Sequence, residues 1–222
     1  LPKFGTQVLM NVINEMGALP TRNHRDVQFE KAGRISAEAM HEKRPTDGKA
    51  QLVTNAACFA CTIACGRISK IDQTHFTVTN NPKYWGATGG LEYEAAWALG
   101  AANGVGDLEA LHYANMLCNE QGMDPITFGT TVGAAMELYE LGLLTKEQIG
   151  EEAPFGSTKA MAHFAVEPFA AYFALGTVPK SSDRPRLAQA YILRTADSRL
   201  LAIHLSSLEK FWQGLTTALE AD

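Results

Sequence analysis

The sequence lacks the features that mark several large classes of protein. Its net charge is −5 and it has no run of clustered Lys and Arg, so it carries no electrostatic footprint for nucleic acid or an anionic membrane surface. Its longest apolar tract, from Ala160 to Val178, contains His163, Glu167 and Pro168, which makes it a poor bilayer span. We therefore expect no nucleic-acid partner and no membrane partner.

Common catalytic signatures are also missing. The chain has no phosphate-binding P-loop, no dinucleotide-binding glycine pattern and no nucleophile elbow. Its six histidines are scattered without ligand spacing, which favours structural roles for them. The N-terminal segment has no signal-peptide layout and no initiator Met, and we interpret it as an internal cut.

Cysteine is scarce, but its distribution is informative. Four cysteines occur in 222 residues, and Cys58, Cys61 and Cys65 form a C-x2-C-x3-C run. Such close spacing is typical of metal ligands in a reducing compartment rather than of a disulfide framework, so we expect a cytoplasmic protein. Thiolates are soft ligands that suit iron–sulfur clusters, zinc and copper(I). The run therefore predicts a metal or cluster site, and a cysteine-rich turn without metal is the alternative.

The run alone leaves the site incomplete. An iron–sulfur cluster usually takes four cysteines, and Cys118 is the one remaining thiol. Its helical context favours a core cysteine over a ligand. A zinc site is weakly indicated, because no H-x3-H pair lies nearby. Gly66 allows a sharp turn after the run, and Arg67 could offset the negative charge of a thiolate-bound cluster.

Apolar periodicity predicts a mainly α fold, with a helical domain, minor short strands, and a C-terminal β-hairpin plus helix. The predicted helices are 7–17, 26–44, 92–99, 107–121, 130–141, a short one after Thr145, and 157–166. We expect the first of these to face the core, because Val8, Leu9, Val12, Ile13 and Met16 recur at helical spacing. Two short strands are predicted over 68–71 and 76–79.

The composition changes near the C-terminus. Residues 177–185 are rich in Pro, Ser, Lys and Asp, and we interpret them as a linker. The alternation that follows predicts a hairpin of 190–194 and 200–205, and then a helix over 207–220. The predicted organisation is thus a helical cluster-binding domain over 1–176, the linker, and a tail over 186–222.

The Glu92-Tyr93-Glu94 segment follows a Gly-Gly turn and begins a predicted helix. Its carboxylates could be solvated first-turn residues that the helix dipole favours. The functional alternative is a carboxylic acid and a phenol that transfer or donate protons at a substrate site. Sequence physics alone favours the first interpretation.

Four stretches together resemble the tungsten- or molybdenum-dependent aldehyde:ferredoxin oxidoreductases. They lie in the family order between about residues 5 and 165: Asn11–Glu15 through Leu19–Asn23, the run from Cys58 to Arg67, Glu92–Glu94, and Leu117–Gly129. The combination is specific, although each motif alone is not.

The resemblance implies roles for individual residues. In that family the cysteine run supplies three ligands of a 4Fe-4S cluster, which assigns Cys58, Cys61 and Cys65, while Cys118 matches a cysteine that is not a ligand. A D-x-x-G-L-D segment that contacts the paired pterin maps onto a stretch in which two positions differ from the motif. The matching residues are Asn119, Gly122, Met123 and Asp124, with Asn119 and Met123 as the departures.

The resemblance also implies a catalytic pair and an overall reaction. The Tyr-Glu pair near the metal maps onto Tyr93 and Glu94, with Glu92 as the neighbouring choice. The complete enzyme would oxidise an aldehyde to a carboxylic acid at a tungsten- or molybdenum-bis-pterin and pass electrons through the cluster to ferredoxin or another carrier. This chain lacks the N- and C-terminal domains, including the fourth cluster ligand, so we expect it to be inactive alone. The family's dimer-interface E-x-x-H site has no match at Tyr113–Met116.

Two alternatives stay open. The chain could be a non-catalytic structural or zinc-binding module. Its tail, about residues 183–219, resembles a piece of the CaiB/BaiF acyl-CoA transferase family, which would imply a fusion that handles acyl-CoA.

Overall fold

The computed structural model describes residues 1–167, 190–194 and 200–204. The α-helices are α1 (Leu9–Glu15), α2 (Ala37–His41), α3 (Tyr93–Leu99), α4 (Leu108–Gln121), α5 (Pro125–Glu140), α6 (Lys146–Ile149) and α7 (Thr158–Val166). The strands are β1 (Leu52–Ala56), β2 (Gly66–Ser69), β3 (Thr88–Gly89), β4 (Ala190–Arg194) and β5 (Leu200–His204). Four short 3-10 helices accompany them: η1 (Thr6–Val8), η2 (Ala32–Ile35), η3 (Pro82–Trp85) and η4 (Ala101–Asn103). The described part of the chain confirms a mainly α fold.

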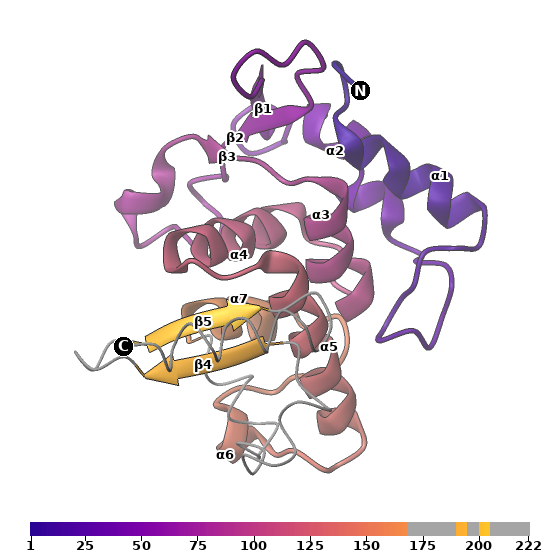
Figure 1. The fold of residues 1–222 in the computed structure, drawn as a ribbon, viewed down its shortest axis with the longest axis vertical. Helices are drawn as coiled ribbons and strands as arrows, with labels where there is room; N and C mark the ends of the chain where they lie inside the picture. Colours follow the sequence, from indigo (N-terminus) through magenta and orange to yellow (C-terminus); the bar gives the residue numbers. More distant parts are fainter. Residues whose placement is uncertain (168–189, 195–199, 205–222) are drawn as a thin grey trace, which may run out of the picture.

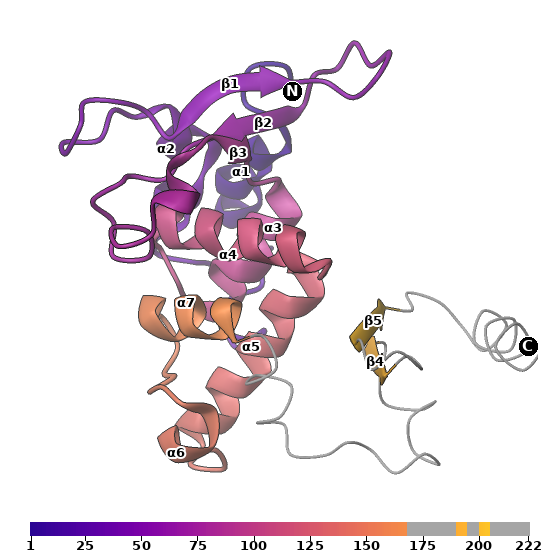
Figure 2. The same cartoon turned by 90° about the vertical axis from the view of Figure 1, so that its left-hand side faces the viewer.

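The first three strands form a small antiparallel sheet in the order β1-β2-β3. This sheet lies at one end of the helical body and α6 at the other, with α3, α4 and α5 between them (Figures 1 and 2). In the sheet, Asn55 pairs with Arg67 and Ile68 pairs with Gly89. Strand β2 therefore connects the loop after β1 to the segment that leads into α3.

Local capping fixes the starts of the long helices. The carboxylates of Asp107 and Asp124 accept hydrogen bonds from the amides of Ala110 (3.1 Å) and Thr127 (2.9 Å) and begin α4 and α5. Thr145 and Ser157 cap α6 and α7 in the same way. Helix α4 ends at Gly122, whose φ of +70° is the left-handed conformation typical of a helix end.

The core lies where α3 and α5 cross. A Cβ on Gly129 would lie 2.5 Å from the carbonyl carbon and oxygen of Ala98, so only glycine allows this approach. The side-chain amide of the buried Asn103 donates to the Ala98 carbonyl at 2.6 Å and to the Gly129 carbonyl at 3.0 Å. Large apolar side chains fill the surrounding space, including Phe29, Phe128, Phe164, Leu99, Leu111 and Met136.

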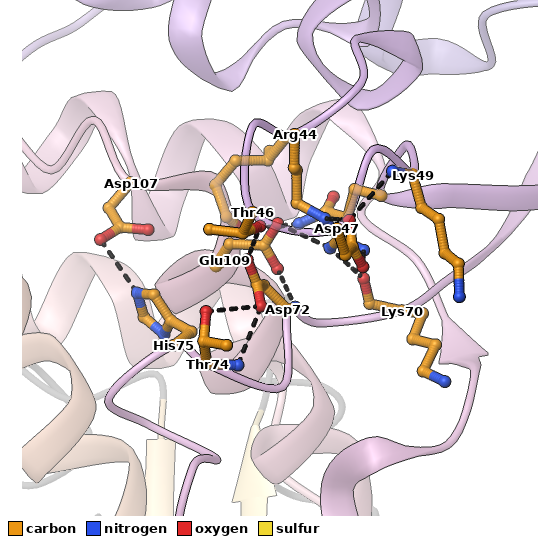
Figure 3. Close-up of polar contacts among 12 residues, drawn as sticks. Arg44, Thr46, Asp47, Lys49, Lys70, Asp72, Thr74, His75, Asp107 and Glu109 are labelled. Atoms are coloured by element: carbon orange, nitrogen blue, oxygen red, sulfur yellow. Dashed lines mark hydrogen bonds and ion pairs between the residues drawn. The ribbon is translucent and has the colours of Figure 1, made fainter.

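A polar network anchors the start of α4 to two preceding loops (Figure 3). The guanidinium of Arg44 donates to Glu109 at 3.0 Å and to Asp47 at 3.1 Å. The other oxygen of Glu109 accepts from the amide of Asp72 at 2.9 Å. His75 Nε2 lies 3.2 Å from the carboxylate of Asp107, the residue that caps α4. The network therefore holds both loops beside the first turn of this helix.

The predicted helix over 26–44 is wrong for most of its length. Only η2 and α2 form there, because side chains accept hydrogen bonds from backbone N–H groups that a continuous helix would use for its own bonds. The amide of Phe29 donates to Asn14 Oδ1 at 2.6 Å, and Ser36 is extended and caps α2. Tertiary contacts thus override the local helical pattern.

Three further predictions need correction. The strand over 76–79 is a turn, because the amides of Val78 and Thr79 both donate to the His75 carbonyl. Helix α5 begins at Pro125 rather than at residue 130, since Asp124 caps it and proline suits a first helical position. The first helix buries Met10, whereas three of the residues predicted to face the core are exposed: Leu9 (40%), Val12 (49%) and Met16 (75%).

Strands β4 and β5 pair antiparallel, with Ala190 opposite His204 and Arg194 opposite Leu200. These positions coincide with the predicted hairpin. The predicted linker over 177–185 and the predicted helix over 207–220 lie outside the described residues. Within the described part of the chain, no helix has the length and apolar character needed to cross a bilayer.

Candidate metal centre

The three clustered cysteines lie on the loop that joins β1 to β2, residues 57–65, which we call the cysteine loop. Cys58 is exposed, Cys61 and Cys65 are partly buried, and all three thiols are free. The loop projects from the sheet end of the molecule (Figures 1 and 2). The predicted ligands are therefore on one accessible loop.

The backbone of the cysteine loop turns twice in the same way. Ala60 and Ala64 have φ of +57° and +49°, and each directly precedes a cysteine. Left-handed backbone costs an alanine roughly 1–2 kcal/mol, so the surrounding structure must hold both turns. The amide of Cys61 also donates to the Cys58 carbonyl at 3.0 Å.

The three thiols can be compared with the ligand requirements of a single ion and of a cluster. Among the described residues, no three His, Cys, Asp or Glu side chains come together as a group that could hold a metal ion. A zinc ion needs all of its thiolates about 2.3 Å from one point. In an iron–sulfur cluster, each cysteine binds a separate iron, so the thiolates need not converge on one atom. Three free thiols on one loop thus match the ligand chemistry of a cluster.

The apolar residues between the cysteines are exposed. The Phe59 side chain is fully exposed (103%), and Ile63 is half exposed. Among the described residues, neither side chain is packed into the core.

Arg67 follows the cysteine loop and is almost fully buried. Its guanidinium donates to the carbonyls of Gly66 (2.8 Å) and Leu1 (3.0 Å). Burial lowers the pKa of Arg67, whereas the charges of Glu92 and Cys65 act in the opposite direction. Arg67 is therefore the electrostatic link between the cysteine loop and the start of α3.

The Glu92-Tyr93-Glu94 segment forms the start of α3, as predicted. Thr6 binds this start from the N-terminal segment: its hydroxyl oxygen accepts from the Tyr93 amide at 3.0 Å, and the hydroxyl donates to the Glu92 carboxylate. Burial, followed by the charge of Glu94, raises the pKa of the Tyr93 phenol, which therefore keeps its proton at neutral pH. Glu94 is exposed in the first helical turn.

The predicted pterin-contact residues form the turn between α4 and α5. Asn119 and Gly122 are exposed, and a Cβ on Gly122 would meet nothing within 4 Å. Asp124 Oδ2 accepts from the amide and hydroxyl of Thr127 at 2.9 and 2.6 Å. The Met123 amide donates to the Cys118 carbonyl at 2.8 Å.

Cys118 is a core residue. It is 0% exposed on α4, and burial, assisted by the charge of Asp124, raises the pKa of its thiol to about 12. A neutral, enclosed thiol is a poor metal ligand. The favoured interpretation of Cys118 as a core cysteine therefore agrees with its place in the structure.

The structure joins two of the three predicted site segments. Arg67 Nη1 donates to the Ala64 carbonyl in the cysteine loop at 3.4 Å, and the Arg67 carbonyl accepts from the amide of Gly90, two residues before Glu92, at 2.7 Å. Beside the α4–α5 turn, Glu120 pairs with Lys83 at 3.0 Å, and Gln121 donates to the Ala165 carbonyl at 3.2 Å.

Sequence reasoning missed Thr6, Gly5 and Gly90. Thr6 binds α3 across 87 residues. The two glycines border the side chain of Arg67, as described below. No local pattern marks these contacts, because each joins segments far apart in the sequence.

Comparisons with known proteins identify the family. The profile of a family described as aldehyde ferredoxin oxidoreductase, domains 2 & 3, matches residues 1–167. Tungsten-containing aldehyde ferredoxin oxidoreductase from Thermococcus kodakarensis is 44% identical over 172 residues, covering 77% of this chain and 25% of that protein. The protein of the same name from Pyrococcus abyssi is 42% identical over 182 residues (80% of this chain, 27% of that protein). That from Pyrococcus furiosus is 38% identical over 193 residues (86% and 29%).

The chain spans about a quarter of the length of these relatives. The family profile ends at residue 167, and the matches do not support the expected likeness of residues 183–219 to the CaiB/BaiF family. Apart from β4 and β5, that segment lies outside the described residues. On the extent of the profile match and the identity to these relatives, the chain belongs to the aldehyde ferredoxin oxidoreductase family.

Proposed function

We propose that this chain is the cluster-bearing part of a tungsten-dependent enzyme that, as the complete protein, oxidises aldehydes to carboxylic acids. The observation that carries the proposal is the cysteine loop, which presents three free thiols within the segment that matches the family. The relatives named above are tungsten-containing oxidoreductases, which supports the same chemistry here.

Cys58, Cys61 and Cys65 would hold a 4Fe-4S cluster as thiolates. The fourth ligand would come from another part of the complete protein, because Cys118 is enclosed in the core. The exposed Phe59 and Ile63 would then pack against that part and exclude water from the sulfurs.

When bound, a tungsten-pterin centre supplies the two-electron oxidation of the aldehyde, and the cluster supplies one-electron transfer. Adding water to an aldehyde and removing two electrons also releases two protons. Glu94, exposed on the first turn of α3, would accept a proton from the reacting water. Tyr93 keeps its phenolic proton and would donate a hydrogen bond to the substrate oxygen.

The α4–α5 turn would contact the pterin. Asn119 offers an exposed amide, and the backbone at Gly122 is open to close approach. Asp124 holds the turn in place through its bonds to Thr127. Electrons would leave to ferredoxin or another carrier, and the reactive thiols favour a cytoplasmic setting.

The test uses the complete parent protein, purified anaerobically. We expect iron and acid-labile sulfide in the ratio of a 4Fe-4S cluster, bound tungsten, and aldehyde-dependent reduction of a viologen dye. Cys58→Ser, Cys61→Ser and Cys65→Ser should each lose most of the iron and sulfide. Cys118→Ala is the matched control, which should keep the cluster because this thiol lies in the core.

Two results would contradict the proposal. A parent protein without iron and labile sulfide would exclude the cluster. Zinc in place of iron, with no sulfide, would favour the structural or zinc-binding module instead.

A further inference from the structure

Arg67 is a buried cation without a carboxylate partner in the part of the chain that the structure describes. It is 4% exposed, and its guanidinium hydrogen bonds go to backbone carbonyls of Leu1, Ala64 and Gly66. Arg44 is also largely buried, but it pairs with two carboxylates, Asp47 and Glu109. Burying a charge is unfavourable unless an opposite charge compensates it. Arg67 therefore needs a nearby negative charge. Among the described side chains, no carboxylate forms an ion pair with it.

Gly5 and Gly90 border the side chain of Arg67 and form a narrow slot around it. Gly5, with φ of +61°, lies so close that a Cβ there would be 2.7 Å from Arg67 Nη2 and 2.9 Å from its Cζ. On the sheet side, a Cβ on Gly90 would lie 2.8 Å from the Cβ of Arg67. Two glycines from distant segments thus leave room for one arginine and limit its rotation.

The cysteine loop borders the slot on another side. A Cβ on Gly5 would also lie 2.9 Å from the Cys65 carbonyl oxygen, so the slot and the third cysteine share a wall. Arg67 Nη1 donates to the Ala64 carbonyl, inside the loop itself. A cluster with thiolate ligands carries net negative charge, and it would lie directly beside this fixed cation.

We propose that Arg67 is the fixed counter-charge of the cluster and raises its reduction potential, an inference that rests on the proposed function above. Reduction adds one electron to the cluster and so increases its negative charge. A buried cation stabilises the reduced form more than the oxidised form, because the low-dielectric surroundings screen it little. The three carbonyl acceptors hold the cation in place through both redox states.

The experiment compares Arg67→Gln and Arg67→Lys in the complete protein. The midpoint potential of the cluster is measured by EPR-monitored redox titration, with iron and sulfide content measured in the same samples. In Arg67→Gln we expect the ratio of reduced to oxidised cluster at a fixed potential to fall about tenfold, equivalent to about 59 mV for one electron. Arg67→Lys keeps the charge and should recover most of the parent potential. The matched control is Arg34→Gln, which removes an exposed positive charge from η2 and should leave the potential unchanged.

Glu92→Gln gives an independent reading if Arg67→Gln does not fold. It removes the charge of the carboxylate that opposes the cation and keeps Gly5 and Gly90 unchanged, so the midpoint potential should rise. The inference is overturned if Arg67→Gln keeps its cluster at the parent potential, or if Arg67→Gln and Arg67→Lys shift the potential equally. It is overturned as well if Arg67→Gln fails to fold and Glu92→Gln leaves the potential unchanged. A parent protein that binds no cluster would contradict the proposed function first, and that result is distinguished by iron and sulfide content alone.

Discussion

Arg44 Nη1 lies 3.0 Å from Glu109 Oε1, and this ion pair joins the segment before β1 to the first turn of α4. Both side chains are mostly buried, with 12% and 16% exposed. The second oxygen of Glu109 accepts from the Asp72 amide, so one carboxylate holds two loops (Figure 3).

Glu109→Ala should therefore lower the free energy of unfolding by about 3 kcal/mol, because it leaves a buried cation and an amide without their acceptor. Urea unfolding followed by tryptophan fluorescence measures the change. Glu120→Ala is the control, since it breaks the exposed pair with Lys83 and should cost less than about 1 kcal/mol. Equal losses in the two variants would show that burial of the Arg44 pair has no energetic consequence.

His112 should make the protein less stable in acid. Burial lowers the pKa of this histidine from 6.5 to about 4. Its Nε2 lies 2.9 Å from Thr88 Oγ1, while Nδ1 is buried without a partner among the described residues. The unfolded chain binds a proton on this histidine at a higher pH than the folded chain does. The free energy of unfolding is therefore greatest above pH 6.5 and decreases as the pH falls toward 4. The loss is on the order of 3 kcal/mol.

Urea unfolding at intervals between pH 7.5 and 4.5 tests this dependence. In His112→Gln the slope of stability against pH should become shallower. A His112 ring that titrates near its ordinary pKa in NMR spectra of the folded protein would contradict the prediction.

Gly129→Ala should destabilise the crossing of α3 and α5. The added methyl group would overlap the carbonyl of Ala98, and overpacking of this kind costs about 1–3 kcal/mol. Gly86→Ala is the matched control, because a Cβ there meets nothing within 4 Å and its φ is −72°. Thermal unfolding should separate the two variants, and an unchanged Tm for Gly129→Ala would show that the helices can move apart at little cost.

The four cysteines should differ sharply in alkylation. In protein stripped of metal, iodoacetamide at pH 8 should modify Cys58, Cys61 and Cys65 under native conditions. Cys118 should react only after unfolding, because burial encloses it and raises the pKa of its thiol to about 12. Peptide mass spectrometry counts the modified sites, and native labelling of Cys118 at a comparable rate would refute its placement in the core.

Features that depend on neighbouring residues could be predicted from the sequence. Asp107 and Ser157 start helices because each caps an amide only three residues away. The spacing of the cysteine run is likewise local, and it identifies the loop. The region over 26–44 could not be predicted, because Phe29 bonds to Asn14 rather than to its own helix.

The surroundings of the cysteines could not be predicted either, because they also depend on contacts between segments that are distant in the sequence. Arg67 was recognised as a possible counter-charge, but its slot depends on Gly5 and Gly90, which no pattern connects to it. Phe59, an apolar residue between two of the cysteines, is fully exposed. Only the fold shows that it lies outside the packed interior.

The contacts of the N-terminal segment bear on how the molecule is assembled. Leu1 meets Arg67 across 66 residues, and Thr6 meets Tyr93 across 87. Residues 1–6 are synthesised before residues 67 and 93, at about 5–20 residues per second, so these contacts can form only seconds after the first residues have emerged. Closing such long loops is also slow. The sheet end of the molecule is therefore completed late, after the start of α3 has been synthesised.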